Sequence, residues 1–424
     1  MSTYPPSQVA TGVATGMPAA DAPLDSARGE IRALTGLRLF AALWVLAFHL
    51  HLTPGETYAR YWESLHPLVV AGELGVDLFF VLSGVVIAHT YARKLGPGLR
   101  ARAVGSFVWA RLSRIWPVYA VLTVGFGAWL VFRAQFDSDG KIAYQAIQPD
   151  IGIGSWLQQL VMVQLWSRPV FDGSSFVGPA WSISAEWLAY LLFPLLVLVA
   201  WRLRWLPAPV LGGLALLPLA PQVVFAVAPP APPFTWAMRI LGGFTSGMLV
   251  WLALRRVPRT PRVSRIAGWV ALAAIVEIGI VLWWAAAIDS YEAKNVAVLA
   301  FPVLLGALAL GDRGPAAVLS RPWAVHGGRI SFSLYLIHIP IIELYWTAMD
   351  NIPAMAAGTA LATLVLPHLL VISLLAAHLL WRWVEEPARE WLRERDPFRG
   401  RQPSVAPRSA TTVPETRPLD LQEA

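Results

Sequence analysis

The chain has no cysteine among its 424 residues, which excludes disulfide bonds, thiolate metal ligands and a cysteine nucleophile. It also has little charge: only 14% of its residues are Asp, Glu, Lys or Arg, whereas an average soluble domain has about 25%. Hydrophobic residues make up 56% of the chain, and it contains 21 tryptophans, a residue that gathers at membrane interfaces. This composition predicts an all-α fold, a polytopic bundle of transmembrane helices.

The two ends of the chain differ in composition from the rest. The first thirty residues have neither the basic segment nor the apolar segment of a secretory signal, and the last thirty are polar and rich in proline. Such segments bury too little apolar surface to fold. We therefore predict a disordered tail at 1–30, a transmembrane domain at 31–393 and a second disordered tail at 394–424.

A helix needs about 20 apolar residues to cross the hydrocarbon layer of a membrane. This length predicts about ten spans, at residues 34–52, 74–91, 115–133, 184–203, 207–228, 236–254, 266–288, 296–311, 330–349 and 355–384.

A further apolar segment, 154–166, is too short to cross the membrane. Its Leu157, Leu160, Val161 and Leu165 share one helical face, which predicts a helix that lies in the membrane interface.

The charges between these spans alternate along the chain. The even-numbered connections and both segments outside the spans carry most of the arginines and lysines, so the positive-inside rule places them and both termini in the cytoplasm. This bias also explains most of the net charge of +7 without a nucleic-acid partner. We therefore expect a multi-pass protein of the cytoplasmic (inner) membrane. The odd-numbered connections are acidic or nearly uncharged; their acids are Glu56, Glu63, Glu73, Asp137, Asp139, Asp150, Asp172, Asp289 and Glu292.

Titratable residues inside the spans are costly and often functional. Arg38 and His49 in the first span are eleven residues apart, about 16.5 Å along a helix and almost on the same face. Asp77 and Glu186 lie near the outer ends of the second and fourth spans, toward the level of His49. By the same topology, two further arginines, Arg111 and Arg114, open the third span at the cytoplasmic level of Arg38.

This placement separates two kinds of chemistry across the membrane. Clustered arginines suit a ligand that carries phosphates, because guanidinium groups bind phosphate oxygens in pairs. A histidine that acts as a general base needs an orienting neighbour, and a carboxylate is the usual one. The sequence therefore predicts a phosphorylated donor on the cytoplasmic side and a histidine base on the outer side.

At these residues the chain resembles the acyltransferase-3 family of integral membrane acyltransferases, over about residues 30–390. The resemblance is specific because six elements occur in family order with matching predicted topology. They are the Arg38-x10-His49 spacing, GVDLFFVLSG (75–84), the R-x-x-R element Arg111–Arg114, WSISAEW (181–187), GRISFSLYLIHIP (328–340) and WVEEPAR (383–389).

The resemblance implies transfer of an acyl group, often acetyl, from cytoplasmic acyl-CoA to hydroxyls of surface glycans or of small molecules such as macrolides. It also implies that His49 is the essential histidine, either a general base or a transient acyl carrier. By the same resemblance Arg38, Arg111 and Arg114 bind the CoA or lie along the path of the donor. We expect no metal cofactor and no fused extracytoplasmic hydrolase-like domain of the kind that some relatives carry.

The remaining candidates have both a functional and a structural interpretation. Asp77 and Glu186 are catalytic candidates that would tune His49, but an acid near a helix start is also favoured by the helix dipole. Ser182, which shares a helical face with Glu186, His338 and Arg239 are candidates for substrate binding. The structural alternatives are an interhelical hydrogen bond for His338 and an ion pair with an outer carboxylate for Arg239.

Two functions remain open from the sequence. The leading hypothesis is an acyl-CoA-dependent O-acyltransferase that uses acetyl-CoA as donor and a glycan or a macrolide sugar as acceptor. The alternative is a transporter or a flippase, suggested by Glu277, His368 and Arg239 as titratable groups within spans. No pair of interrupted spans in an inverted repeat, which transporters often have, supports the second hypothesis.

Overall fold

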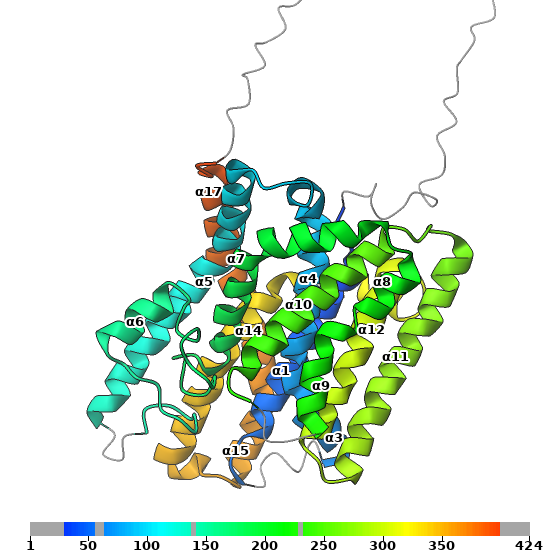
Figure 1. The fold of residues 1–424 in the computed structure, drawn as a ribbon. Helices are drawn as coiled ribbons and strands as arrows, with labels where there is room; N and C mark the ends of the chain where they lie inside the picture. Colours follow the sequence, from blue (N-terminus) through cyan, green and yellow to red (C-terminus); the bar gives the residue numbers. More distant parts are fainter. Residues whose placement is uncertain (1–28, 56–62, 137–140, 228–231, 399–424) are drawn as a thin grey trace, which may run out of the picture.

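The computed structural model describes residues 29–55, 63–136, 141–227 and 232–398, and within these ranges the chain forms helices and no strands (Figure 1). The predicted all-α fold is confirmed. The α-helices are α1 (Arg32–His51), α3 (His66–Val70), α4 (Leu74–Leu95), α5 (Ala101–Phe136), α6 (Ile153–Leu160), α7 (Trp181–Arg202), α8 (Ala208–Leu214), α9 (Ala220–Val227), α10 (Thr235–Leu254), α11 (Pro261–Ala287), α12 (Ala300–Leu310), α13 (Pro315–Leu319), α14 (Pro322–Asn351), α15 (Ala360–Val365), α16 (His368–Leu380) and α17 (Glu386–Glu394).

Nine helical segments of the described chain are long and apolar enough to cross a membrane, and they include every predicted span except the fifth. The fifth, 207–228, was wrongly predicted as one helix. It is divided into α8, the 3-10 turn η6 (Leu217–Leu219) and α9. Pro218 and Pro221 lie at the break, where a proline cannot donate the backbone hydrogen bond that a continuous helix requires. The segment still runs from one end of the bundle to the other (Figure 1).

Two other spans have bounds that differ from the prediction. The third, predicted at 115–133, is the much longer α5, whose first turns pack against α17. Trp109 of α5 donates a 2.7 Å hydrogen bond from Nε1 to the carbonyl of Leu392. The last span, predicted at 355–384, begins only at His368 and continues through the π-helical turn η9 (Trp381–Glu385) into α17.

The predicted interface helix is shorter than expected. It is α6, which ends at Leu160, and Met162 has a positive φ of 60°, so a helix to residue 166 was wrong. Ile153 and Leu157 are strongly exposed, as expected for a face in contact with lipid. Gln159 points inward and donates a 3.2 Å hydrogen bond to the carbonyl of Ser174, which holds α6 against the following loop.

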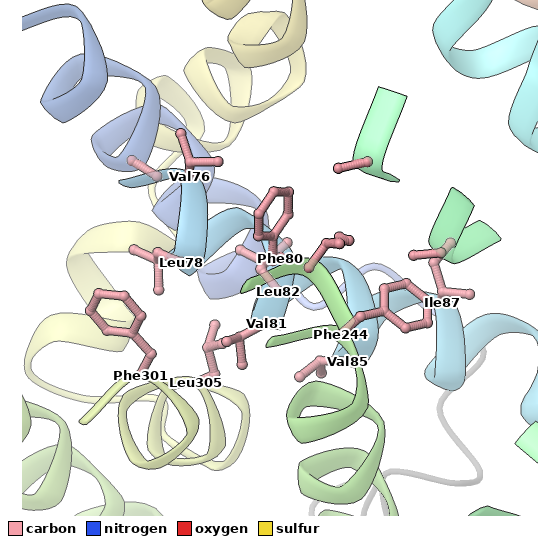
Figure 2. Packing of buried hydrophobic residues seen from close by; sticks show 14 of the residues in the cluster. Val76, Leu78, Phe80, Val81, Leu82, Val85, Ile87, Phe244, Phe301 and Leu305 are labelled. Carbon is pink, nitrogen blue, oxygen red and sulfur yellow. The ribbon is translucent and has the colours of Figure 1, made fainter. Parts of the chain in front are cut away.

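The centre of the bundle is formed by α1, α4, α10 and α14. Helices α4 and α10 pack together, as do α1 and α14. A Cβ on Gly247 of α10 would overlap the carbonyl oxygen of Val81 in α4, so only glycine permits this approach. Figure 2 shows the surrounding apolar side chains, with Phe244 of α10 and Leu305 of α12 beside the valines of α4. This packing holds the helices that carry the titratable residues in a fixed arrangement.

Most of the predicted tails lies outside the described residues, at 1–28 and 399–424, and Glu56, Asp137 and Asp139 are also outside them. The described parts of both tails contact the helices. Glu30 accepts hydrogen bonds from Thr35 (3.0 Å) and Arg329 (3.1 Å), and Asp396 accepts one from Ser106 (2.6 Å). The first turn of α1 and helix α17 therefore lie at the same end of the bundle (Figure 1).

Candidate active site

Two cavities lie between the central helices. We name the one that contains His49 the histidine cavity and the one that contains Arg38 the arginine cavity; their volumes are about 240 and 310 Å³. Val76 of α4 and Tyr335 of α14 line both cavities, so these two side chains separate them. The two candidate residues of α1 thus lie in different cavities, at opposite ends of one helix.

The arginine cavity contains the three arginines that the sequence singles out, Arg38, Arg111 and Arg114. Two further arginines that the prediction missed, Arg389 and Arg393 of α17, also line it. The signal for these two was that Arg389 closes the WVEEPAR element and that Arg393 follows it by four residues, one helical turn further on. Five guanidinium groups around one cavity form a site for an anion with several negative charges.

Buried partners hold two of these arginines in place. Arg114 forms an ion pair with Glu385 of η9, which is almost fully buried and also accepts a 2.6 Å hydrogen bond from Ser333. Arg111 donates a hydrogen bond to the hydroxyl of Tyr91 at 3.1 Å and lies over that ring. Its Nε is buried and has no hydrogen-bond partner in the described chain. Arg111 therefore retains a donor that a bound anion can use.

Glu186 lies in the arginine cavity and does not line the histidine cavity. Its carboxylate accepts hydrogen bonds from Ser83 of α4 and from Tyr190, the latter at 2.5 Å. The predicted depth of Glu186, toward the outer side with His49, does not match this placement. Its position among arginines suits it to balance their charge rather than to tune the histidine.

The ring of His49 is held by two hydrogen-bonding partners. Its Nδ1 lies 2.8 Å from the carbonyl of Val45 and 3.2 Å from Nε2 of His338. Nδ1 of His338 lies 3.2 Å from the carbonyl of Leu334. A carbonyl can only accept, so both Nδ1 atoms carry the hydrogen, and Nε2 of His338 accepts from His49. Nε2 of His49 is then the unprotonated nitrogen, as a general base requires.

The buried Asp77 and the half-buried Arg239 form an ion pair. Nε and Nη2 of Arg239 donate to the two carboxylate oxygens at 3.0 and 2.7 Å, and Gln222 donates to Asp77 at 3.0 Å. Arg239 lines the histidine cavity and lies 5.2 Å over the ring of Trp181, whereas Asp77 does not line it. Asp77 therefore positions Arg239 rather than His49.

One of the acids that line the cavity with His49 is Glu73, which the sequence suggested only as a loop residue. It pairs with Lys294 at 3.0 Å and accepts a hydrogen bond from Tyr291, also at 3.0 Å. Glu73 precedes Asp77 by four residues, so helical spacing was the signal that could have found it.

Ser182 lies where the two cavities meet. Its hydroxyl is 2.7 Å from the hydroxyl of Tyr335, and the two hydroxyls lie 3.0 and 2.9 Å from the carbonyl of Pro179, so one of them donates to the carbonyl and the other donates to its hydroxyl neighbour. Glu277 and His368, the basis of the transporter hypothesis, are exposed on α11 and α16 and line neither cavity. Across the described ranges, no group of three or more His, Asp or Glu side chains could hold a metal ion.

The fold and the cavities define a multi-pass membrane protein with a half-buried histidine in one cavity and an arginine cluster in the other. Comparison with known families identifies the class of enzyme. Residues 31–382 match the acyltransferase domain of the Acyl_transf_3 family, and the chain belongs to this acyltransferase-3 family. The resemblance inferred from the motifs is confirmed, and the protein is an integral membrane acyltransferase.

Two curated relatives illustrate the range of the family. Acyltransferase MdmB of Streptomyces mycarofaciens is 28% identical over 401 residues, which cover 90% of this chain and 96% of that protein. Peptidoglycan O-acetyltransferase OatA of Listeria monocytogenes is 25% identical over 339 residues, which cover 75% of this chain and only 50% of that protein. No solved structure matches the chain.

Proposed function

We propose that this protein is a membrane O-acyltransferase that moves an acyl group, acetyl in the simplest case, from cytoplasmic acyl-CoA to a hydroxyl of a carbohydrate or similar acceptor. One observation carries the proposal: a histidine with an unprotonated Nε2 and a cluster of arginines lie in two cavities that share Tyr335. We place the arginine cavity toward the cytoplasm, with both termini, in the cytoplasmic membrane. The positive-inside bias supports this orientation.

The arginine cavity suits the donor. The phosphates of CoA would bind Arg38, Arg111 and the neighbouring guanidinium groups, where paired hydrogen bonds and charge act together. The acyl thioester would extend past Tyr335 toward His49. The distance from Arg38 to His49 along α1, about 16.5 Å at 1.5 Å per residue, requires a donor with a long arm between its phosphates and its acyl group.

The proposed reaction uses the unprotonated Nε2 of His49. Nε2 takes the proton of the acceptor hydroxyl while that oxygen attacks the thioester carbonyl, and the carbon–sulfur bond breaks. The thiolate of CoA then receives the proton from His49, which restores the imidazole. In the alternative sequence Nε2 itself accepts the acyl group and passes it to the hydroxyl. Both sequences need the tautomer that Val45 and His338 favour.

The histidine cavity suits a sugar. Phe171, Trp181 and Trp346 are among its walls, and aromatic rings pack well against the apolar faces of sugar rings. OatA is named for peptidoglycan, a glycan. We therefore take the acceptor class to be a hydroxylated ring, either in a surface glycan or in a macrolide sugar.

The experiment uses the full chain in lipid nanodiscs with labelled acetyl-CoA and a panel of soluble glycosides. Release of free CoA that depends on the glycoside, with label recovered as a base-labile ester on it, supports the proposal. Vesicle uptake of a glycoside without thiol release would instead support the transporter hypothesis, which the exposed positions of Glu277 and His368 do not favour. Thiol release at the same rate with and without every glycoside would contradict acyl transfer to a hydroxyl acceptor.

A further inference from the structure

Glu343 of α14 is a buried carboxylate that the proposed reaction does not use. It lines the histidine cavity, and only 2% of the residue is exposed. Its Oε2 atom is buried and, within the described chain, has no hydrogen-bond partner. Leaving a carboxylate oxygen unpaired in an apolar interior costs about 1–3 kcal/mol or more. An unpaired oxygen in the wall of a substrate cavity therefore indicates that a ligand supplies the missing partner.

The protein groups around Glu343 do not supply a hydrogen-bond partner for Oε2. The backbone N–H of Tyr144 faces the carboxylate and the guanidinium of Arg133 attracts it electrostatically, but neither group forms a hydrogen bond with Oε2. Arg133 also donates a 2.8 Å hydrogen bond to the carbonyl of Lys141 and lies 5.0 Å from the centre of the Tyr144 ring. These contacts leave Oε2 open.

The histidine cavity has more acid than base along its walls. Its acids are Glu73, Asp172 and Glu343, and its guanidinium is that of Arg239. Arg239 is already paired with the buried Asp77, so it does not neutralise the cavity. Glu73 is paired with Lys294, which leaves Glu343 and Asp172 as the acids that have no cation paired with them in the cavity wall. Asp172 is only partly buried and accepts a hydrogen bond from the backbone of Ile147 at 3.1 Å.

The surplus of acids favours a cationic ligand, and the aromatic residues of the cavity favour one as well. The faces of aromatic rings attract cations as well as sugar rings, and the attraction increases when the cation is removed from water. Tyr144 and Trp346 have ring centres 5.2 Å apart, and both line the cavity together with Glu343. A carboxylate with aromatic rings beside it is a suitable site for an ammonium group.

We propose that Glu343 binds a protonated amine of the acceptor, and that the substrate class is a hydroxylated ring with a basic amine, such as an amino sugar. This inference rests on the proposed function for the reacting hydroxyl, whereas the binding step requires no acyl transfer. The amine forms an ion pair with Oε2 of Glu343, and the ring packs against the aromatic walls. The acceptor hydroxyl then lies toward Nε2 of His49.

The test measures binding to the full chain in nanodiscs by isothermal titration, with two matched glycosides as probes. One is an alkyl glycoside with a dimethylamino group, which cannot form a stable amide, and the other has a hydroxyl in its place. We expect the amine to bind at least about tenfold more tightly, as for a hydrogen bond to a charged group. Glu343→Gln should reduce this preference to less than twofold, and Glu343→Asp should retain part of it.

The control is Glu277→Gln, the same substitution at an exposed position of α11 outside the cavity, which should leave the preference unchanged. Equal binding of the two glycosides to the wild-type protein would overturn the inference. So would an amine preference that persists in Glu343→Gln. If Glu343→Gln does not fold, the amine preference of the wild-type protein and its partial loss in Glu343→Asp still test the inference.

Thiol release separates this inference from the proposed function. If the amine preference depends on Glu343 but no glycoside promotes thiol release, the proposed function fails and the amine site stands. If neutral glycosides are acylated as fast as amines and bind as tightly, the proposed function stands and the amine site fails.

Discussion

Nε2 of His338 lies 3.2 Å from Nδ1 of His49, so a histidine of α14 directly orients the histidine of α1. His338 is fully buried and lines neither cavity, which makes it a positioning residue with no path to the substrate. The carbonyl of Leu334 accepts the hydrogen of Nδ1 of His338. This fixes the tautomer of His338 and leaves its Nε2 without a hydrogen, as an acceptor for His49.

We expect His338→Phe to lower kcat by about 10-fold to 100-fold, less than the loss expected when the general base itself is removed. The KM for the acceptor should change by less than twofold, because no substrate contact is lost. Steady-state kinetics with the best glycoside of the panel test this prediction. A large rise in KM at constant kcat would show that His338 binds substrate, as the sequence alone suggested.

The arginine cavity predicts a specific effect on the donor. Arg111→Lys keeps the charge but removes the planar guanidinium whose buried Nε is available to an anion. We expect the KM for acetyl-CoA to rise at least about tenfold and the KM for the acceptor to stay within twofold. Arg265→Lys, on the exposed surface of α11 and outside the cavity, is the matched control. The assignment fails if both variants have the donor affinity of the wild type.

The pair formed by Asp77 and Arg239 predicts a strong coupling in stability. Asp77→Ala leaves the half-buried guanidinium of Arg239 without its carboxylate, a loss of at most about 3–5 kcal/mol. The double variant Asp77→Ala/Arg239→Met should recover part of this loss, because no unpaired charge remains. Thermal unfolding of the wild type, Asp77→Ala, Arg239→Met and the double variant in one detergent measures the coupling. Strictly additive changes would contradict a direct interaction.

The close approach of α4 and α10 predicts that Gly247 tolerates no side chain. Gly247→Ala places a Cβ against the carbonyl of Val81, and the helices must separate. We expect a loss of about 1–3 kcal/mol, measured as a lower unfolding temperature. Gly279→Ala in α11 is the control, because its Cβ would have no neighbour within 4 Å, and alanine favours a helix more than glycine does. Equal stability of the two variants would argue against this packing.

Much of the fold was predictable because the hydrocarbon layer imposes a length on each span. Nine of the predicted spans correspond to long apolar helices of the described chain. The fifth was not predicted correctly because hydrophobicity alone does not show whether Pro218 and Pro221 break a helix. The bounds of the last span were also missed, because its apolar sequence continues across the breaks before His368.

For the site, the sequence predicted that Arg38 and His49 lie at different levels of α1, but it predicted neither the level of Glu186 nor the neighbours of the candidate side chains. Spacing along α1 placed Arg38 and His49 correctly in separate regions, since helical rise fixes depth. Depth does not show which neighbour a side chain meets, so the partners of Asp77 and Glu186 could not be inferred. Glu343 belongs to no motif, and only the packing around it shows that one of its oxygens lacks a partner.

The most direct test of this account is acceptor-dependent thiol release by His49→Gln, which keeps a polar side chain but removes the base. The variant should insert into the membrane and unfold at the same temperature as the wild type, since Val45 and His338 lose only one hydrogen-bond donor. We predict that its rate of CoA release, with the best acceptor of the panel, falls at least about 100-fold. A rate within twofold of the wild type would contradict the assignment of His49 as the reacting histidine.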